Sequence, residues 1–180
     1  MKSTELYAIL RQEVGPWAKE EGFRRAKAML SWWRPYGDLF VVFWFQAWQH
    51  GWDNYAGSKF TVEFQIGPEP AVGWFEIRRA RLPRLLDEQA REVLRLRQNE
   101  VISALPRPPA NHPFLHAPGN VPHYYLSQFD TVDRPYAADF DIWLRYYSAE
   151  DVHAWGQFVR QHLPHCIEQV EGWELTSAST

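Results

Sequence analysis

The sequence predicts an α+β fold: a mostly antiparallel sheet of about four to six strands, packed by three helices, in a single domain. Short turns join apolar segments with a two-residue period, and helical patterns lie before and after them. A chain of 180 residues is long enough to bury about 70% of its unfolded surface around one core. Apolar residues make up 46% and charged residues 23%, which is an ordinary globular composition.

Near the start of the chain, apolar residues recur every three or four positions, as in a helix with one buried side: Leu6, Leu10, Val14 and Trp17. Ser3 is a suitable N-terminal cap for this helix, and Gly22 is a suitable end. The chain is therefore expected to open with an amphipathic helix that covers one face of the sheet.

Three strands are expected next, at residues 28–34, 39–48 and 59–67. The turn at residues 35–38 contains Pro and Gly, and the connection at 51–58 contains Asp, Asn and two Gly. Because both links are short, the strands are predicted to be antiparallel neighbours.

The strand at 59–67 alternates cleanly, with apolar residues on one face (Phe60, Val62, Phe64 and Ile66) and polar residues on the other (Thr61, Glu63 and Gln65). The strand at 39–48 differs, because the face opposite its core side still carries Phe40, Val42, Trp44, Gln46 and Trp48. Two interpretations follow: a further layer of protein covers this face, or it is an aromatic surface used for binding.

Residues 74–81 suit either a last strand or an extended link. A long helix is predicted at 82–105, opened by Pro83. A Pro/His-rich loop follows at 106–122.

The last third of the chain is expected to hold a short edge strand at 124–129, an alternating strand at 138–146 and a helix at 148–162 that Pro164 breaks or bends. We expect one domain over residues 1–175 and a disordered polar tail at 176–180.

The order of these elements resembles that of the domain-of-unknown-function 4304 family, which consists of small bacterial α+β proteins. The resemblance covers about residues 1–70 and rests on Gly22, Phe23, Trp33, Arg34, Trp44, Phe45, Gln46, Phe60, Thr61, Val62, Ile66 and Gly67. It implies an α+β fold and roles such as immunity or interaction proteins. It supplies no catalytic residues.

Composition favours a cytoplasmic protein with no cofactor. Cys166 is the single cysteine, so a reducing compartment is the simpler interpretation. The longest apolar run, residues 39–45, is far shorter than the roughly 20 residues that cross a bilayer as a helix. A net charge of -3 gives no general reason to expect nucleic acid as a partner.

Two patterns could carry chemistry. His112, His116 and His123 lie in the Pro/His-rich loop and could bind zinc if a carboxylate or a fourth His joined them, but their spacing matches no zinc signature and we predict no metal. Cys166 follows His165, but adjacent helical residues point about 100° apart, so a buried packing cysteine is the preferred interpretation.

The candidate binding residues are aromatic and acidic: Trp44, Trp48, Trp52, Asp139, Asp141 and Trp143. Exposed Trp side chains anchor many protein interfaces. The acidic residues could meet a basic partner, since three Arg and nine acidic residues lie between 128 and 180.

The leading hypothesis is a non-enzymatic protein-binding module, of the immunity or antitoxin kind, whose partner is a basic or toxin-like protein. The alternative is a binder of small molecules or peptides, or an unrecognised hydrolase, with a cleft near the His-rich loop. Arg78, Arg79, Arg81 and Arg84 raise a third hypothesis, single-stranded nucleic-acid binding, which the overall charge disfavours.

Overall fold

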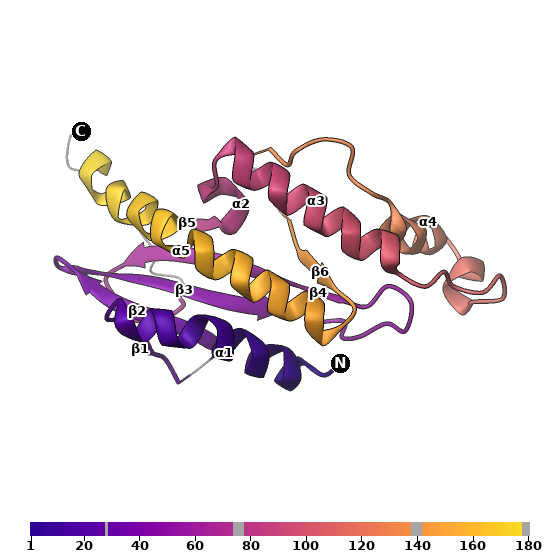
Figure 1. Cartoon of the computed structure of the whole chain (residues 1–180), viewed down its shortest axis with the longest axis horizontal. Helices are drawn as coiled ribbons and strands as arrows, with labels where there is room; N and C mark the ends of the chain where they lie inside the picture. The colour runs from indigo at the N-terminus through magenta and orange to yellow at the C-terminus, as the bar shows by residue number, and fades with distance from the viewer. Residues whose placement is uncertain (28, 74–77, 138–141, 178–180) are drawn as a thin grey trace.

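A six-stranded antiparallel sheet runs through the computed structural model, which describes residues 1–27, 29–73, 78–137 and 142–177 (Figure 1). The strands are β1 (Arg24–Arg25), β2 (Leu30–Tyr36), β3 (Leu39–Ala47), β4 (Ser58–Gly67), β5 (Arg78–Arg81) and β6 (Leu144–Tyr146). The helices are α1 (Ser3–Glu20), α2 (Leu82–Leu85), α3 (Glu88–Ala104), α4 (Val121–Leu126) and α5 (Ala149–Ser177), with short 3-10 turns η1 (Pro113–His116) and η2 (Ser127–Phe129). The predicted α+β class is confirmed.

The sheet has the order β1-β2-β3-β4-β5, and β6 also pairs with β4. β3 occupies one edge of β4, while β5 and β6 share the other. β5 pairs with Glu63 to Ile66 and β6 pairs with Ser58 to Phe60. The short turns produce the predicted β2-β3-β4 meander, whereas β6 reaches β4 from much later in the chain.

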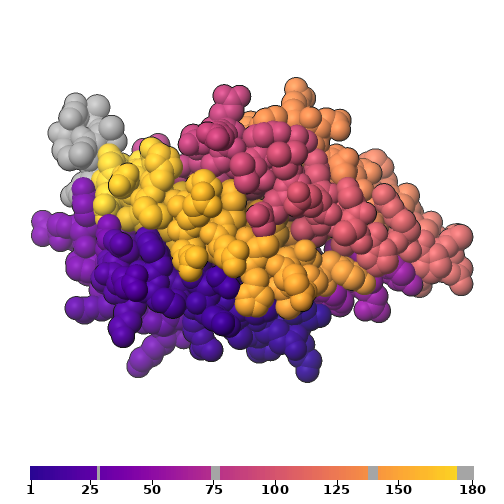
Figure 2. All heavy atoms as spheres, in the orientation of Figure 1, coloured from indigo at the N-terminus to yellow at the C-terminus, as the bar shows by residue number. Residues whose placement is uncertain are grey.

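One face of the sheet carries the main hydrophobic core. Helices α1 and α5 lie side by side over this face, and α3 lies next to α5 (Figures 1 and 2). Phe43 is at the centre of an aromatic cluster, with ring centroids 5.2 Å from Phe23, 5.2 Å from Trp32 and 6.2 Å from Phe64. This face is the one that the alternation in β3 and β4 predicts.

The opposite face of the sheet is also covered. Trp44 is 0% exposed, and the polar side chains of Glu63 and Gln65 are 2% exposed. Gln65 Nε2 donates to the carbonyl of Ala71 (2.7 Å), and Thr61 Oγ1 donates to the carbonyl of Ile142 (3.4 Å). Of the two interpretations of this face, a covering layer is therefore correct at Trp44.

The expected helix at 82–105 is two helices. Leu86 is extended, and Asp87 caps α3 through its Oδ1, which accepts a hydrogen bond from the amide of Ala90 (2.7 Å). A carboxylate at the N-cap satisfies a free helical N–H, and the capping geometry requires an extended residue at this point. The pattern predicted the buried stripe but not the break.

The expected edge strand at 124–129 is wrong, because these residues form α4 and η2. Pro122 lies in the first turn of α4, where its missing N–H costs nothing. The Pro/His-rich segment is also more ordered than predicted, since it contains η1 and packs on a small second core of Ala56, Leu105, Tyr125 and Phe129.

Helix α5 continues through Pro164, so the predicted end at residue 162 is wrong. Pro164 removes one helical hydrogen bond, but it is exposed, so water can reach the freed carbonyl. Buried residues on both sides of Pro164 keep the helix on the core: Leu163, Cys166, Ile167 and Val170. Thr176 and Ser177, assigned to the tail, belong to α5, and 178–180 lie outside the described residues.

The strand predicted at 138–146 is present as β6, Leu144–Tyr146; residues 138–141 lie outside the described part. Similarly, β5 begins at Arg78, and residues 74–77 of the predicted strand or link are not described.

Cys166 is a buried packing residue in α5, while the neighbouring His165 is exposed. Burial raises the pKa of the Cys166 thiol to about 12. Because the thiolate is the reactive form, we expect a maleimide reagent at pH 8 to label the native protein very slowly and the urea-unfolded protein rapidly. Fast labelling of the native protein would contradict this assignment.

Candidate functional site

A cleft of about 700 Å³ opens between the β3–β4 loop, residues 48–57, and the α4 region. Figure 1 shows this loop at one end of the sheet, close to α4. Aromatic and cationic side chains line the cleft, among them Trp48, Trp52, Lys59, Tyr124, Tyr125 and Arg145. It has the size of an ordinary small-ligand site.

Asp53 fixes the shape of the β3–β4 loop. Its Oδ1 accepts hydrogen bonds from the amides of Tyr55 (2.8 Å) and Ala56 (2.7 Å), which is the side-chain turn that Asp favours. The backbone of Asp53 also exchanges two hydrogen bonds with that of Gly57, at 2.8 and 3.0 Å. The loop is therefore closed on itself.

Tyr125 connects the two walls of the cleft. Its hydroxyl donates to Asp53 Oδ1 (3.1 Å), and its ring stacks on His112 with centroids 4.8 Å apart. Burial and the Asp53 carboxylate raise the pKa of Tyr125, so its hydroxyl stays protonated and keeps this bond. The α4 wall is thus bound directly to the loop wall.

Arg145 lies at the back of the cleft and is 6% exposed. Its Nη1 donates to the carbonyl of Ala56 (2.7 Å) and its Nη2 to Gln128 Oε1 (2.6 Å), both neutral acceptors. Its Nε has no partner among the described residues. Burial lowers the pKa of Arg145, but guanidinium remains charged in proteins.

Lys59 faces Arg145 directly, because the two residues are paired in the register of β4 and β6. Like charges in opposing positions destabilise a sheet. No described carboxylate lies within ion-pair distance of either cation, and the Asp53 carboxylate in the same cleft acts on Arg145 from farther away. Burial, with Arg145 nearby, lowers the pKa of Lys59 to about 8. The cleft therefore carries two cations that an anionic ligand would compensate.

On the second face of the sheet, Lys59 belongs to a row of cations that lie over Trp rings. Lys59 Nζ lies 4.3 Å from the centroid of Trp48, and Trp48 meets Trp143 edge to face at 4.9 Å. Arg81 lies over Trp143 (5.4 Å), and Arg79 lies over Trp44 (4.7 Å).

Glu63 joins the two arginines at the centre of this series. Its carboxylate accepts a hydrogen bond from Arg79 Nε at 2.6 Å and another from Arg81 Nε at 3.3 Å. A buried carboxylate requires such partners. Arg79 and Arg81, two members of the arginine cluster that suggested nucleic-acid binding, therefore have a structural role.

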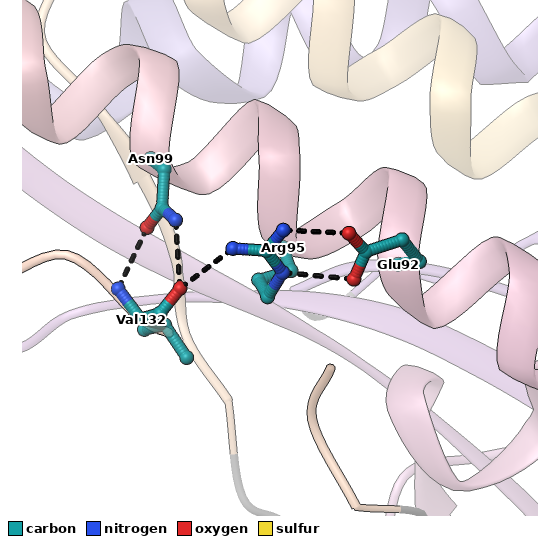
Figure 3. Close-up of polar contacts among 4 residues, drawn as sticks. All are labelled: Glu92, Arg95, Asn99 and Val132. Atoms are coloured by element: carbon teal, nitrogen blue, oxygen red, sulfur yellow. Dashed lines mark hydrogen bonds and ion pairs between the residues drawn. The ribbon is translucent and has the colours of Figure 1, made fainter. Parts of the chain in front are cut away.

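The segment that leads into β6 is anchored on α3. Figure 3 shows the Asn99 amide exchanging two hydrogen bonds of 2.8 Å with the backbone of Val132. Arg95 donates to the same carbonyl (2.8 Å) and pairs with Glu92. At the other end, Gln98 Oε1 accepts from the amide of Arg145 (3.0 Å), so α3 helps to position the cation.

A second pocket of about 620 Å³ lies on the other side of the β3–β4 loop, at the start of α1. Lys2, Ser3 and Thr4 line it, together with Tyr7 and Tyr146. Trp48, Gly51, Trp52 and Ser58 line both pockets.

The predicted binding residues have different outcomes. Trp48 and Trp52 are half-buried and line both pockets. Trp143 is half-buried against Trp48. Trp44 is completely buried, so it is not part of an exposed surface. Asp139 and Asp141 lie outside the described residues.

The three loop histidines do not form a common site. His112 stacks on Tyr125, while His116 contacts the carbonyl of Ala110 (2.8 Å). His123 lies on α4 and is exposed. Within the described residues, no group of three or more His, Cys, Asp or Glu side chains could hold a metal ion.

Sequence reasoning missed the cations of the cleft. Lys59 and Arg145 both occupy the polar positions of alternating strands, where a solvated side chain is the usual outcome. Nothing in the local sequence signals that these two strands pair in this register.

No described helix combines the length and apolar character needed to cross a membrane. Comparisons with protein-family models, with curated proteins and with solved structures give no match. The resemblance to the domain-of-unknown-function 4304 family therefore stays a prediction.

Proposed function

We propose that this protein binds a small anionic ligand with an aromatic or apolar body in the cleft between the β3–β4 loop and α4. The observation that carries the proposal is the direct opposition of Lys59 and Arg145, with no described carboxylate within ion-pair distance of either. Arg145 is buried and Lys59 is half-buried, so their charges favour a compensating group, which a bound carboxylate, sulfonate or phosphate would provide.

The walls of the cleft support the rest of the proposal. Trp48, Trp52 and Tyr124 offer flat apolar surfaces, and Tyr124 is 55% exposed at the opening. Binding pockets commonly combine such walls with a few polar groups that fix orientation. The ligand class is thus an anion attached to a ring or a hydrocarbon group.

Binding is favoured over hydrolysis by the state of the other polar groups. Ser58 Oγ donates to the carbonyl of Gly51 (2.8 Å), and Asp53 Oδ1 already accepts three hydrogen bonds. A nucleophile needs a neighbouring base to activate it, and the Ser58 hydroxyl is directed to a backbone carbonyl instead of a base.

A protein-binding role with a basic partner stays a prediction from sequence. It used an acidic surface at Asp139 and Asp141, which lie outside the described residues, and Trp44, which is buried. The described cations of the cleft favour an anionic ligand instead.

The proposal is tested by calorimetric titration with 8-anilinonaphthalene-1-sulfonate, an anion with aromatic rings. We expect one site, and we expect Lys59→Gln to weaken binding by about tenfold or more, since a charge-assisted contact contributes roughly 1.5–3 kcal/mol. Lys59→Arg and the exposed Lys27→Gln are the controls and should bind nearly as the parent does. Equal affinities of the parent protein and Lys59→Gln for the sulfonate would contradict the proposed function.

Binding should also depend on pH through Lys59. The ammonium is charged below its pKa of about 8, and the sulfonate stays ionised throughout. We therefore expect affinity to fall as the pH rises from 7 to 9.5, whereas Lys59→Arg should hold its affinity over this range. A flat profile in the parent protein would contradict a direct contact with Lys59.

Lys59 also affects the stability of the ligand-free protein, but in the opposite direction: stability rises with pH, whereas ligand affinity falls. The pKa of Lys59 is about 8 in the folded protein and ordinarily 10.5. Between these two pH values, and without ligand, Lys59 is more fully protonated in the unfolded chain than in the folded chain. The contribution of Lys59 to the free energy of unfolding therefore rises with pH across this window. Urea titrations of the parent and Lys59→Gln at pH 7.5 and 10 measure it.

A further inference from the structure

We propose that the cleft is a site of covalent attachment, where Lys59 forms an imine with a 2-oxo acid whose carboxylate lies against Arg145. The inference rests on the proposed function, because the same cleft and the same two cations hold the ligand. It adds a reaction at Lys59, and it narrows the ligand class to 2-oxo acids that carry an aromatic ring.

The amine of Lys59 lies at the wall of the cleft. Its Nζ is 4.3 Å from the ring centroid of Trp48, and both residues line the cleft. No described carboxylate lies within ion-pair distance of this amine. A ligand in the cleft can therefore reach the amine without displacing a paired acid.

The surroundings of Lys59 favour the neutral, nucleophilic form of its amine. A lysine becomes a nucleophile when burial or a neighbouring cation releases its proton. Lys59 meets both conditions, because it is half-buried and faces Arg145 across the β4–β6 pair. Together they lower the pKa of Lys59 to about 8. At pH 7.5 roughly a quarter of such amines are neutral, against about one in a thousand for a lysine of ordinary pKa.

Imine formation needs no further reagent. The neutral amine adds to the keto carbon, and the keto oxygen leaves as water with the two amine hydrogens. A carbon–nitrogen double bond thus replaces the carbon–oxygen double bond, and the nitrogen then takes one proton from the solvent. The resulting iminium keeps the positive charge at Lys59, and the carboxylate of the ligand compensates this charge and that of Arg145.

A 2-oxo acid matches the two cations because its keto carbon is bonded directly to its carboxylate. Residues paired across antiparallel strands project from the same face, with Cβ atoms about 4.5–5.5 Å apart, so Lys59 and Arg145 can reach the same end of one ligand. Arg145 is 6% exposed, and its described hydrogen bonds go from Nη1 to Ala56 and from Nη2 to Gln128. A guanidinium has five N–H donors, so donors remain for a carboxylate.

The aromatic part of the ligand follows from the other walls of the cleft. Trp48, Trp52 and Tyr124 line it and offer flat surfaces on which a ring can stack. A 2-oxo acid with only a methyl group would leave these surfaces uncovered. The expected ligand therefore carries its ring close to the keto group.

The test is reductive trapping with phenylpyruvate and sodium cyanoborohydride at pH 7.5, with peptide mapping by mass spectrometry to locate the reduced adduct. We expect Lys59 to be labelled about tenfold faster or more than the exposed lysines Lys2, Lys19 and Lys27. An excess of 3-phenylpropanoate, which has the same ring and carboxylate without the keto group, should protect Lys59 alone. The methyl ester of phenylpyruvate should lose the preference for Lys59, because it keeps the keto group without the charge.

Lys59→Arg keeps the positive charge but has no amine that can form an imine, so its total label should fall to that of the exposed lysines. Lys27→Arg is the matched control and should leave the labelling of Lys59 unchanged. In a parent protein that binds 8-anilinonaphthalene-1-sulfonate, labelling of Lys59 no faster than that of Lys27, or labelling that 3-phenylpropanoate does not slow, would overturn the imine and leave the proposed function standing. A parent protein that does not bind the sulfonate would instead count against the proposed function.

Discussion

Replacing Gly57 by alanine should destabilise the protein by about 3 kcal/mol or more, through strain and collision together. Gly57 has a φ of +66°, which L residues rarely adopt, and an added Cβ would lie 2.3 Å from the carbonyl oxygen of Tyr146. That oxygen belongs to the backbone of β6, so no side chain can move aside. β6 would have to separate from β4.

Gly51→Ala is the control for this experiment. Gly51 also has a positive φ, +76°, but an added Cβ would meet no atom within 4 Å. Its expected cost is only the roughly 1–2 kcal/mol of the left-handed backbone. Urea unfolding measures both variants, and an equal loss in each would show that the predicted collision does not occur. Because β6 carries Arg145, Gly57→Ala should also weaken sulfonate binding.

Phe43→Ala should cost about 3–5 kcal/mol, the usual range for removing a fully buried aromatic ring. Phe43 is 0% exposed, and its ring contacts aromatic rings from the α1–β1 link, from β2 and from β4. The cavity left behind would be lined by rigid rings that cannot collapse into it. Thermal and urea unfolding of the variant measure the loss.

Phe114→Ala removes the same side chain at a position that is 47% exposed. We expect it to cost about 1 kcal/mol or less, because little apolar surface is lost from the core. Since Phe114 lines the cleft, its effect should appear in ligand binding more than in stability. Similar losses of stability in the two variants would be inconsistent with Phe43 as the centre of the core.

The sheet was predictable where the sequence carries local information. The turn before Leu39 and the alternation from Phe60 to Ile66 determine the order and the buried face of β3 and β4. Pro164 misled the prediction, because a local rule about proline was outweighed by buried residues on both sides of it. Local preference decides an element only where packing does not oppose it.

The candidate site was less predictable, because it depends on pairing between distant segments. Trp48 and Trp52 were selected for their aromatic character, and they do line the cleft. Lys59 and Arg145 were not, since each alone looks like a solvated strand residue. Their common site exists only after β6 pairs with β4.

This late pairing has a kinetic consequence. Strands β2, β3 and β4 are joined by short links and can associate early, whereas β6 must close a long intervening chain and pays a larger entropy. We therefore expect the meander to form first and the β6–β4 contact last. A ligand held by Lys59 and Arg145 would then bind only the completed fold, so it would slow unfolding without accelerating the early steps of folding.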